Sequence, residues 1–349
     1  MQKSINLLDV KNILIVRKHN HLGDMLCSLP LFAALKKKYP FSHITLVVSP
    51  VHFGTNLKEI NPFADEIIEY DKSSFRNTFK FYKKVRKRKY QLGIVPSTVK
   101  ISRTSHIVNY LSGAKNRVGV KRVDNKSNPF HFLLNVKAGF DWDTNKVYQS
   151  DRNLDIARLI GCDLNELERN SIKIHLSEEN RIFAQEFLKK YPSNKNEKLI
   201  AVHPGAGKTA NRWHEDNFIE LIRMINEKYS PRFLITSGKS DENIIAHVRQ
   251  ELDKKNIKYL LYNEASITKF AALLHEADLL ITNDTGPMHI AEFVGTGTLS
   301  LFGPTKGYEW APRGEKHKHI QSESGNINDI TVSRVFNELS GMLENTSNI

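Results

Sequence analysis

The sequence is poor in the residues that staple small domains together. Among 349 residues there are two cysteines, Cys27 and Cys162, which lie far apart and form no CxxC pair. This usage indicates neither a disulfide framework nor a zinc site, and it is typical of a reducing cytosol. No run approaches the roughly 20 apolar residues that span a bilayer. The N-terminus MQKSINLLDV also lacks the apolar segment of a signal peptide. We therefore expect a globular cytoplasmic protein.

Acidic residues are scarce relative to basic ones. The chain has 51 Lys and Arg against 38 Asp and Glu, a net charge of +13, which indicates an anionic partner. The excess is concentrated in KSSFRNTFKFYKKVRKRK (72–89), which contains no acid. Phe75, Phe79, Tyr82 and Val85 recur there at helical spacing and predict an amphipathic basic helix.

Three interpretations of this basic helix remain open. Its charged side can be an ordinary solvated face, or a surface for a phosphorylated glycolipid or an anionic membrane. Nucleic acid is the weakest alternative, because no nucleic-acid-binding motif accompanies the charge. The residues proposed for an acceptor or membrane surface are Lys83, Lys84, Arg86, Lys87 and Arg88.

Several familiar catalytic motifs are missing. The chain has no GxSxG, no HExxH and no GxGxxG after its first apolar run, which disfavours serine hydrolases, zincins and the usual dinucleotide-binding site. GAGKT (205–209) is not a Walker P-loop, because Val202 occupies the position of the required first glycine. The DxD-like pair Asp141-Trp142-Asp143 is predicted to be a loop away from any strand end, so no metal site is predicted.

Short apolar runs alternate regularly with helical patterns, which predicts an α/β fold with parallel sheets covered on both faces. The predicted strands are 12–17, 43–49, 66–70, 91–97 and 117–120, followed by a second series at 199–205, 232–238, 258–263, 279–284 and 298–303. Two Rossmann-like, doubly wound domains facing a cleft are expected, with ligand at the carboxyl ends of the strands.

The predicted domains are residues 1–175 and 176–349. The join is placed within 170–198, where SNKNEK (193–198) resembles a polar linker, and residues 121–150 are predicted to be irregular. The predicted helices are 25–39, 72–89, 152–163, 214–229, 240–255, 266–277, 286–294 and 328–343. The last of these is a candidate to pack back on the first domain.

Three predicted strand ends in the second half carry candidate anion-binding chemistry. HPGAGKTANRW (203–213) offers a loop of Gly205, Ala206 and Gly207 with the cations Lys208 and Arg212, able to approach a phosphate closely. The simpler interpretation is an ordinary basic loop. In SGKSDE (237–242), Glu242 can either complement the dipole of the helix that begins there or accept hydrogen bonds from a ribose.

The strongest pattern is TNDTGPMHIAEFVG (282–295). A buried strand ends at Asp284-Thr285-Gly286, and a helix then begins whose free N–H groups form a cradle for a diphosphate. His289, one turn inside, can face the same point. The alternative is that Asp284 caps the helix and His289 merely packs.

HNHLGDMLCSLP (19–30) places a lone carboxylate, Asp24, where the first strand gives way to a helix. From its position alone, Asp24 can be a helix cap, a loop residue or a general base.

Taken together, LGDMLCSLPLFAALKKKYP, RNLDIARLIG, HPGAGK…NRW, NDTGPMHIAEFVGT and LFGPT resemble the ADP-heptose:lipopolysaccharide heptosyltransferases of glycosyltransferase family 9. The resemblance implies a GT-B fold, with acceptor bound by the N-terminal half and sugar nucleotide by the C-terminal half, and inverting transfer without a metal. It implies that Asp24 is the general base. It also implies that Asp284, Thr285, Gly286 and His289 surround the donor diphosphate, with Glu242 near the ribose.

The same resemblance implies the partners: an ADP-sugar donor, no further cofactor, and a phosphorylated or Kdo-bearing lipid A acceptor at the anionic cytoplasmic face of the inner membrane. One departure is Asn211, which stands where the family usually has a phosphate-binding lysine. Lys208 or Arg212 can substitute for that lysine, and the donor sugar stays open. The remaining alternatives are another nucleotide-sugar donor, a sugar-nucleotide epimerase, and a non-catalytic nucleotide- or glycolipid-binding protein.

Overall fold

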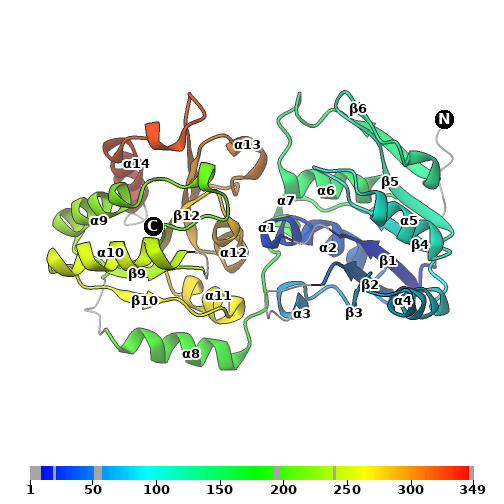
Figure 1. The fold of residues 1–349 in the computed structure, drawn as a ribbon, viewed down its shortest axis with the longest axis horizontal. Helices are drawn as coiled ribbons and strands as arrows, with labels where there is room; N and C mark the ends of the chain where they lie inside the picture. The colour runs from blue at the N-terminus through cyan, green and yellow to red at the C-terminus, as the bar shows by residue number, and fades with distance from the viewer. Residues whose placement is uncertain (1–8, 19–20, 51–56, 192–196, 239–240, 346–349) are drawn as a thin grey trace. The chain divides into compact units, whose positions relative to one another are not determined.

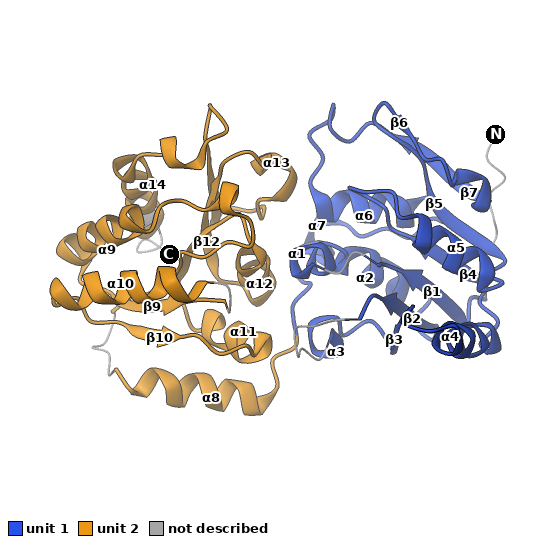
Figure 2. Ribbon diagram, in the orientation of Figure 1, with its two compact units in different colours: residues 1–174 blue, residues 175–349 orange. Residues whose placement is uncertain are grey.

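The computed structural model describes residues 9–18, 21–50, 57–191, 197–238 and 241–345. The chain divides into two compact units, Met1–Ile174 (unit 1) and His175–Ile349 (unit 2), coloured separately in Figure 2. Most of the predicted linker SNKNEK falls outside the described residues. No helix of the described chain combines the length and the apolar character needed to cross a membrane.

Unit 1 is built on one twisted sheet whose strands run in the order β3-β2-β1-β4-β5 and are parallel (Figure 1). Two further strands join β5, with β6 antiparallel and β7 parallel to it. The strands are β1 (Asn12–Val16), β2 (His43–Val48), β3 (Glu66–Glu69), β4 (Leu92–Val95), β5 (Asn116–Val123), β6 (Lys126–Ser127) and β7 (Val136–Phe140).

Apolar strand residues pack against helices to form the core of unit 1. Leu14 and Val16 of β1 belong to a buried cluster with Phe81 and Val85 of α4 and Val108 of α5, and elsewhere α2 packs against α6. The helices are α1 (Leu22–Leu26), α2 (Leu29–Lys38), α3 (Leu57–Ile60), α4 (Phe75–Lys87), α5 (Arg103–Leu111), α6 (Gln149–Arg158) and α7 (Glu166–Asn170), with a 3₁₀ turn η1 (His131–Leu133).

Unit 2 repeats the same strand order with every pair parallel, β10-β9-β8-β11-β12-β13. Its strands are β8 (Leu199–His203), β9 (Arg232–Thr236), β10 (Leu260–Tyr262), β11 (Leu279–Asn283), β12 (Gly297–Phe302) and β13 (His317–Gln321). Its helices are α8 (Glu178–Lys189), α9 (Glu215–Tyr229), α10 (Glu242–Lys254), α11 (Ile267–His275), α12 (Gly286–Val294), α13 (Gly307–Trp310) and α14 (Val332–Asn345), with 3₁₀ turns η2 (Thr209–Asn211) and η4 (Ile327–Asp329).

The core of unit 2 joins its strands to helices α9, α10 and α14. Val335, Leu339 and Leu343 of α14 are buried in that cluster, and α14 packs along α9. The last helix therefore uses its apolar side within unit 2. The α/β prediction with two doubly wound parallel sheets is confirmed.

Several predicted elements are wrong in detail. Residues 121–150 are not irregular, because β5 continues to Val123 and β6 and β7 follow. The predicted join contains helix α8, and β13 was not predicted at all. Strands β7 and β13 each contain a single buried residue, Val136 and Ile320, so neither carries the continuous apolar run that marks a central strand.

The apolar side of the basic helix was predicted correctly only in part, because Val85 is buried and Tyr82 is half-buried, but Phe75 and Phe79 are not. In α4 the buried side chains are Phe81 and Val85, whereas Phe75 and Phe79 are 87% and 62% exposed.

In both sheets the strand order reverses direction at the centre, between β1 and β4 and between β8 and β11. Loops that leave the carboxyl ends of two such strands diverge and open a crevice, where open α/β sheets bind their ligands. Asp24 and Asp284 both follow one of these four central strands.

Candidate functional site

Asp24 lies in the first turn of α1, immediately after the β1 loop. The residue at the N-cap is His21, so the helix-cap interpretation of Asp24 is wrong. The Asp24 side chain is 18% exposed and makes an ion pair through Oδ1 with Nη2 of Arg17 at 3.2 Å. The carboxylate therefore stands at the crevice edge of unit 1, partly open to solvent.

Arg17 is the buried residue that holds Asp24. It follows β1 directly, and its backbone N–H donates to the Val47 carbonyl. Its guanidinium is 6% exposed and also donates from Nη1 to the Asn153 Oδ1 at 3.0 Å and to the Pro96 carbonyl at 3.3 Å. A rigid fork of donors suits such a junction of three partners. Because Pro96 follows β4, Arg17 links the two central strands of the sheet.

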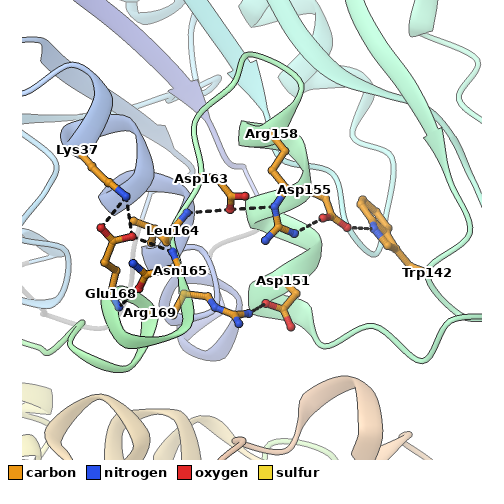
Figure 3. A network of polar contacts seen from close by, with 10 residues as sticks. All are labelled: Lys37, Trp142, Asp151, Asp155, Arg158, Asp163, Leu164, Asn165, Glu168 and Arg169. Carbon is orange, nitrogen blue, oxygen red and sulfur yellow. Dashed lines mark hydrogen bonds and ion pairs between the residues drawn. The ribbon is translucent and has the colours of Figure 1, made fainter.

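Helix α6, which supplies Asn153, is anchored by a polar network (Figure 3). Arg158 of α6 binds Asp163 and Asp155, and Asp155 accepts the indole N–H of Trp142 at 2.8 Å. Further along, Arg169 of α7 pairs with Asp151 of α6. The Asn153 amide itself donates to the Gln149 carbonyl at 2.8 Å. This network fixes the position from which Asn153 orients Arg17.

The same network ties α7 to α2. A reciprocal capping box joins Asn165 to Glu168 at the start of α7, and Lys37 of α2 binds the Glu168 carboxylate at 2.6 Å.

Both acids of the DxD-like pair form ion pairs with arginines of unit 1. Asp141 directly follows β7, contrary to the prediction that the pair lies away from a strand end, and it binds Arg122. Asp143 pairs with Arg152 at 3.0 Å, and Trp142 between them is buried. Both carboxylates are thus neutralised by arginines, an arrangement that does not suit a cation site.

In unit 2, Asn283 at the end of β11 holds the loop that follows β8. Its amide donates to the carbonyls of Pro204 and Gly205 at 2.8 and 3.2 Å, and its Oδ1 accepts the Trp213 backbone N–H at 3.1 Å. Trp213 is fully buried and donates its indole N–H to the Ile330 carbonyl. The loop containing Gly205, Ala206, Gly207 and Lys208 is therefore fixed at both of its ends.

A buried acid, Asp241, lies against this loop. Its Oδ2 accepts the Gly238 N–H at 2.9 Å, and its Oδ1 lies 3.7 Å from Nη2 of Arg212. A Cβ added to Gly205 would fall 2.1 Å from the Asp241 carboxylate, so the approach is possible for glycine alone. Arg212 also donates to the Ala206 carbonyl at 2.9 Å. Its guanidinium thus braces the loop from Asp241 to Ala206.

His203 is the last residue of β8 and directly precedes this loop. Its Nδ1 lies 3.0 Å from the Thr236 hydroxyl. Burial lowers the pKa of His203 to about 4, against a smaller opposing effect of the Asp241 charge. The imidazole is therefore neutral at pH 7.

Asp284 follows β11, and its carboxylate is bound by Asn211. The Asn211 Nδ2 donates to Asp284 Oδ2 at 2.7 Å and approaches the Thr305 hydroxyl at 3.3 Å. Burial raises the pKa of Asp284 above its ordinary value, while the Thr305 hydroxyl and the charges of His289 and Lys208 act in the opposite direction. Asn211 is thus a neutral partner of this acid, at the position where the resemblance leads one to expect a lysine.

Helix α12 begins directly after these residues. Thr285 is its N-cap but makes no side-chain capping bond, and a proline occupies the first turn. The start of the helix faces the carboxyl edge of the sheet, where a helix N-terminus favours an anion. His289 is buried, with its Nδ1 3.6 Å from the Glu292 carboxylate and its ring 6.2 Å from that of Trp310.

The structure gathers most of the predicted donor residues at one edge of unit 2. Asp284, Thr285 and Gly286 lie beside the loop of Gly205 to Lys208, because Asn211 and Asn283 bridge the two segments. Glu242 is exposed at the start of α10. The SGKSDE turn also contributes a buried acid, Asp241, and Ser240 of the same turn lies outside the described residues.

Sequence reasoning missed Arg17, Asn153, Asn283 and His203. Arg17, His203 and Asn283 each stand at the end of a predicted central strand, which is the signal that would have singled them out. Asn153 carries no such signal.

Comparison with known proteins identifies relatives. The family model for glycosyltransferase family 9 (heptosyltransferase) matches residues 78–338. Lipooligosaccharide heptosyltransferase 2 of Campylobacter jejuni is 30% identical over 183 residues, covering 52% of this chain and 55% of that protein. The chain thus spans about half the length of the curated relatives that it matches first.

Solved structures show the same fold. A glycosyl transferase family 9 protein from Veillonella parvula superposes with a TM-score of 0.78 at 20% identity, covering 97% of this chain and 98% of that one. The Escherichia coli ADP-heptose lps heptosyltransferase II superposes with a TM-score of 0.74 at 20% identity, covering 97% and 99%. The predicted GT-B type of fold is confirmed.

Proposed function

The chain belongs to glycosyltransferase family 9, and from this premise we propose that it transfers a heptose from an ADP-heptose donor to the inner core of a lipopolysaccharide. The donor and acceptor are suggested by the names of its relatives, a lipooligosaccharide heptosyltransferase 2 and an ADP-heptose lps heptosyltransferase. A phosphorylated or Kdo-bearing lipid A at the cytoplasmic face of the inner membrane is the acceptor that we propose.

The observation that carries the proposal is the position of the Asp24 carboxylate and its ion pair with Arg17. Its carboxylate does not cap α1 and is held at the crevice edge by a buried arginine. The ion pair uses Oδ1, and we propose that Oδ2 faces a substrate hydroxyl. A carboxylate oriented by a buried arginine at the end of a central strand is suited to general base catalysis.

In the proposed reaction, Asp24 takes the proton of an acceptor hydroxyl as that oxygen attacks the anomeric carbon of the donor sugar. The bond between the anomeric carbon and the phosphate oxygen breaks, and ADP leaves with the electron pair. Attack from the face opposite the leaving group inverts the anomeric configuration.

The leaving diphosphate gains negative charge, which we propose is stabilised by the start of α12 and by Lys208. Preorganised N–H groups and a cation of this kind perform the role that a metal ion performs in other transferases. The carboxylate that lies just before α12, Asp284, is bound by the Asn211 amide, so we do not propose it as a metal ligand. No metal or other cofactor enters the proposed reaction, and Glu242 is proposed to contact the ribose.

The proposed function is tested by a donor screen read by mass spectrometry. The purified chain is offered ADP-heptose and other nucleotide sugars with deep-rough lipopolysaccharide, and we expect a heptose-sized mass increase with ADP-heptose alone. Asp24→Asn should lower turnover by 10²-fold or more, while its affinity for ADP, measured by calorimetry, stays within about twofold of the parent. Asp9→Asn, which removes an exposed carboxylate of the same unit, is the control.

The outcomes separate the alternatives. Near-normal turnover of Asp24→Asn would show that another group is the base. Transfer from a different donor would correct the sugar, a result that Asn211 makes worth testing. Conversion of a nucleotide sugar without any acceptor would indicate an epimerase, and ADP-sugar binding without turnover on any core acceptor would indicate a binding protein.

A further inference from the structure

Helix α4 presents two phenylalanines to solvent. Phe75 is 87% exposed and Phe79 is 62% exposed. They are four residues apart, so they lie side by side on consecutive turns of the helix. Scattered exposed apolar residues are ordinary on a protein surface. Two adjacent large aromatic side chains on one helix face instead expose a contiguous apolar area to water, which is typical of an interaction site.

The exposed side of α4 is otherwise basic. Arg76, Lys80, Lys83, Arg86 and Lys87 are all exposed, and with the two phenylalanines they form what we call the outer face of α4. No acid occurs between residues 72 and 89.

Two other predicted surface cations have a structural partner. Lys84 and Arg88 each lie 2.9 Å from the carboxylate of Glu66. They therefore contribute less charge to the outer face than the sequence alone suggested.

The orientation of α4 is fixed from its opposite side. Phe81 and Val85 are buried in the core of unit 1, and the Phe81 ring lies 4.6 Å from that of Tyr70. The helix begins at a firm cap, because the Ser74 hydroxyl accepts the Asn77 N–H at 3.1 Å. A helix held in this way cannot turn Phe75 and Phe79 inward without losing its buried residues.

The outer face begins at the same sheet edge as Asp24. Strand β3 runs parallel to β1, so α4, which starts shortly after β3 ends, has its N-terminus at the carboxyl edge of the sheet. Lys72, two residues before the cap, lies beside Lys18, the neighbour of Arg17. Burial lowers the pKa of Lys18, and the Lys72 ammonium lowers it further.

We propose that the outer face of α4 docks on an anionic lipid bilayer, with Phe75 and Phe79 entering the boundary between head groups and acyl chains and the surrounding cations contacting lipid phosphates. Large apolar side chains among lysines and arginines are the composition of helices that lie in a membrane interface. The docking deepens the proposed function, on which its consequence for catalysis rests: it would bring the acceptor-binding edge of unit 1 to the membrane that carries a lipid-linked acceptor.

Charge and shape favour a bilayer over other occupants. A second copy of this face would bring two sets of cations together, which repel. Single-stranded nucleic acid prefers positively charged grooves in which its bases stack on aromatic rings. The outer face is the convex side of one helix, and Asn77 is turned away to donate to the Asp71 carboxylate at 2.6 Å.

The test is co-sedimentation of the full chain with sucrose-loaded vesicles that contain no lipopolysaccharide. We expect binding to vesicles with 30% phosphatidylglycerol and little binding to pure phosphatidylcholine. Phe75→Ala with Phe79→Ala should weaken partition at least about tenfold, because the apolar contribution is lost. Lys80→Gln with Lys83→Gln should weaken it roughly fivefold per charge. Since all four side chains are exposed, these variants are expected to fold normally.

Matched controls use the same substitutions elsewhere. Phe132→Ala removes a phenylalanine that is 69% exposed on η1, and Lys255→Gln with Lys258→Gln removes two exposed cations of unit 2. Neither control should change partition by more than about twofold. Equal loss in the controls would overturn the assignment to α4.

Two results would overturn the proposal outright: parental vesicle binding by the double phenylalanine variant, or tighter binding to single-stranded DNA than to anionic vesicles at equal salt. The vesicle assay contains no donor and no acceptor. Its result therefore tests membrane docking even if the proposed transferase activity is wrong. Conversely, turnover of the phenylalanine variant on a detergent-soluble acceptor should equal that of the parent, which shows that the variant retains its active site.

Discussion

At the scale of single residues, the two units use the same device to build their crevice edges. In unit 1, Arg17 after β1 donates to the Pro96 carbonyl after β4. In unit 2, Asn283 at the end of β11 donates to the Pro204 carbonyl after β8. In each case a buried side chain from one central strand binds the loop of the other, so the loops that carry the proposed catalytic and donor residues are fixed relative to the sheet.

Asn211 is the residue at which this chain departs from the pattern that it resembles. A lysine there would place a charge beside Asp284, whereas the asparagine gives that carboxylate a neutral hydrogen bond at 2.7 Å. The negative charge of Asp284 is then balanced less completely, which agrees with the raised pKa that its burial produces. Lys208, whose charge acts on the same carboxyl, is the cation that we expect to compensate.

The buried imidazole of His203 predicts a pH dependence of stability. Its pKa is about 4 in the folded chain, against 6.5 ordinarily, so between these values the unfolded chain takes up a proton that the folded chain does not. Stability should therefore fall as the pH is lowered from 6.5 to 4. His203→Gln should flatten this slope in urea denaturation followed at several pH values. His175→Gln removes an exposed imidazole as the control, and an unchanged slope in His203→Gln would contradict the assignment.

Whether the role of a single residue can be predicted from the sequence depends on how far away in the chain its contact partners are. Asp24 and Asp284 stand at the ends of apolar runs, so their place at a crevice edge is predictable. The partners of Arg17 are not, because Asn153 is 136 positions away and meets it only once α6 has packed beside the sheet. A buried network of this kind leaves no local periodicity in the sequence.

At the scale of elements, the loop after β8 and the start of α10 approach too closely for any side chain at Gly205. Gly205→Ala would place a Cβ 2.1 Å from the Asp241 carboxylate and force the two elements apart. We expect a loss of stability of roughly 1–3 kcal/mol. Gly207→Ala in the same loop meets no atom within 4 Å and is the control, expected to stay within about 0.5 kcal/mol of the parent. Equal stability of the two variants in urea denaturation would refute the close packing.

The strands that the sequence marks most clearly are those buried on both faces. Strands such as β8 and β11 are buried throughout, and each is marked by a continuous apolar run. The edge strand β13 (HKHIQ) has one apolar residue, Ile320, so its pairing with β12 is decided by the sheet and not by its own composition. The same limit explains α4, where three aromatic residues and Val85 at helical spacing did not reveal that the core would bury Phe81 and Val85.

At the scale of the whole molecule, each unit has its own sheet, its own core and its own crevice edge. The cluster around β8, α9 and α14 lies within unit 2, and the cluster around β1 and α4 lies within unit 1. Every residue proposed to bind the donor belongs to unit 2, and the proposed base belongs to unit 1. If the two units are expressed separately, donor binding should therefore be found in unit 2, while the proposed base remains in unit 1.

The last prediction follows from that division. Residues 175–349 expressed alone should fold cooperatively, because α14 and α9 complete the core of unit 2 without residues of unit 1. The isolated unit should bind ADP within about tenfold of the affinity of the full chain in calorimetry, since the loop after β8 and the start of α12 are both present. Residues 1–174 should not bind ADP, and neither unit alone should transfer sugar. A folded unit 2 that fails to bind ADP would mean that unit 1 supplies part of the donor site, and the donor residues proposed above would then be incomplete.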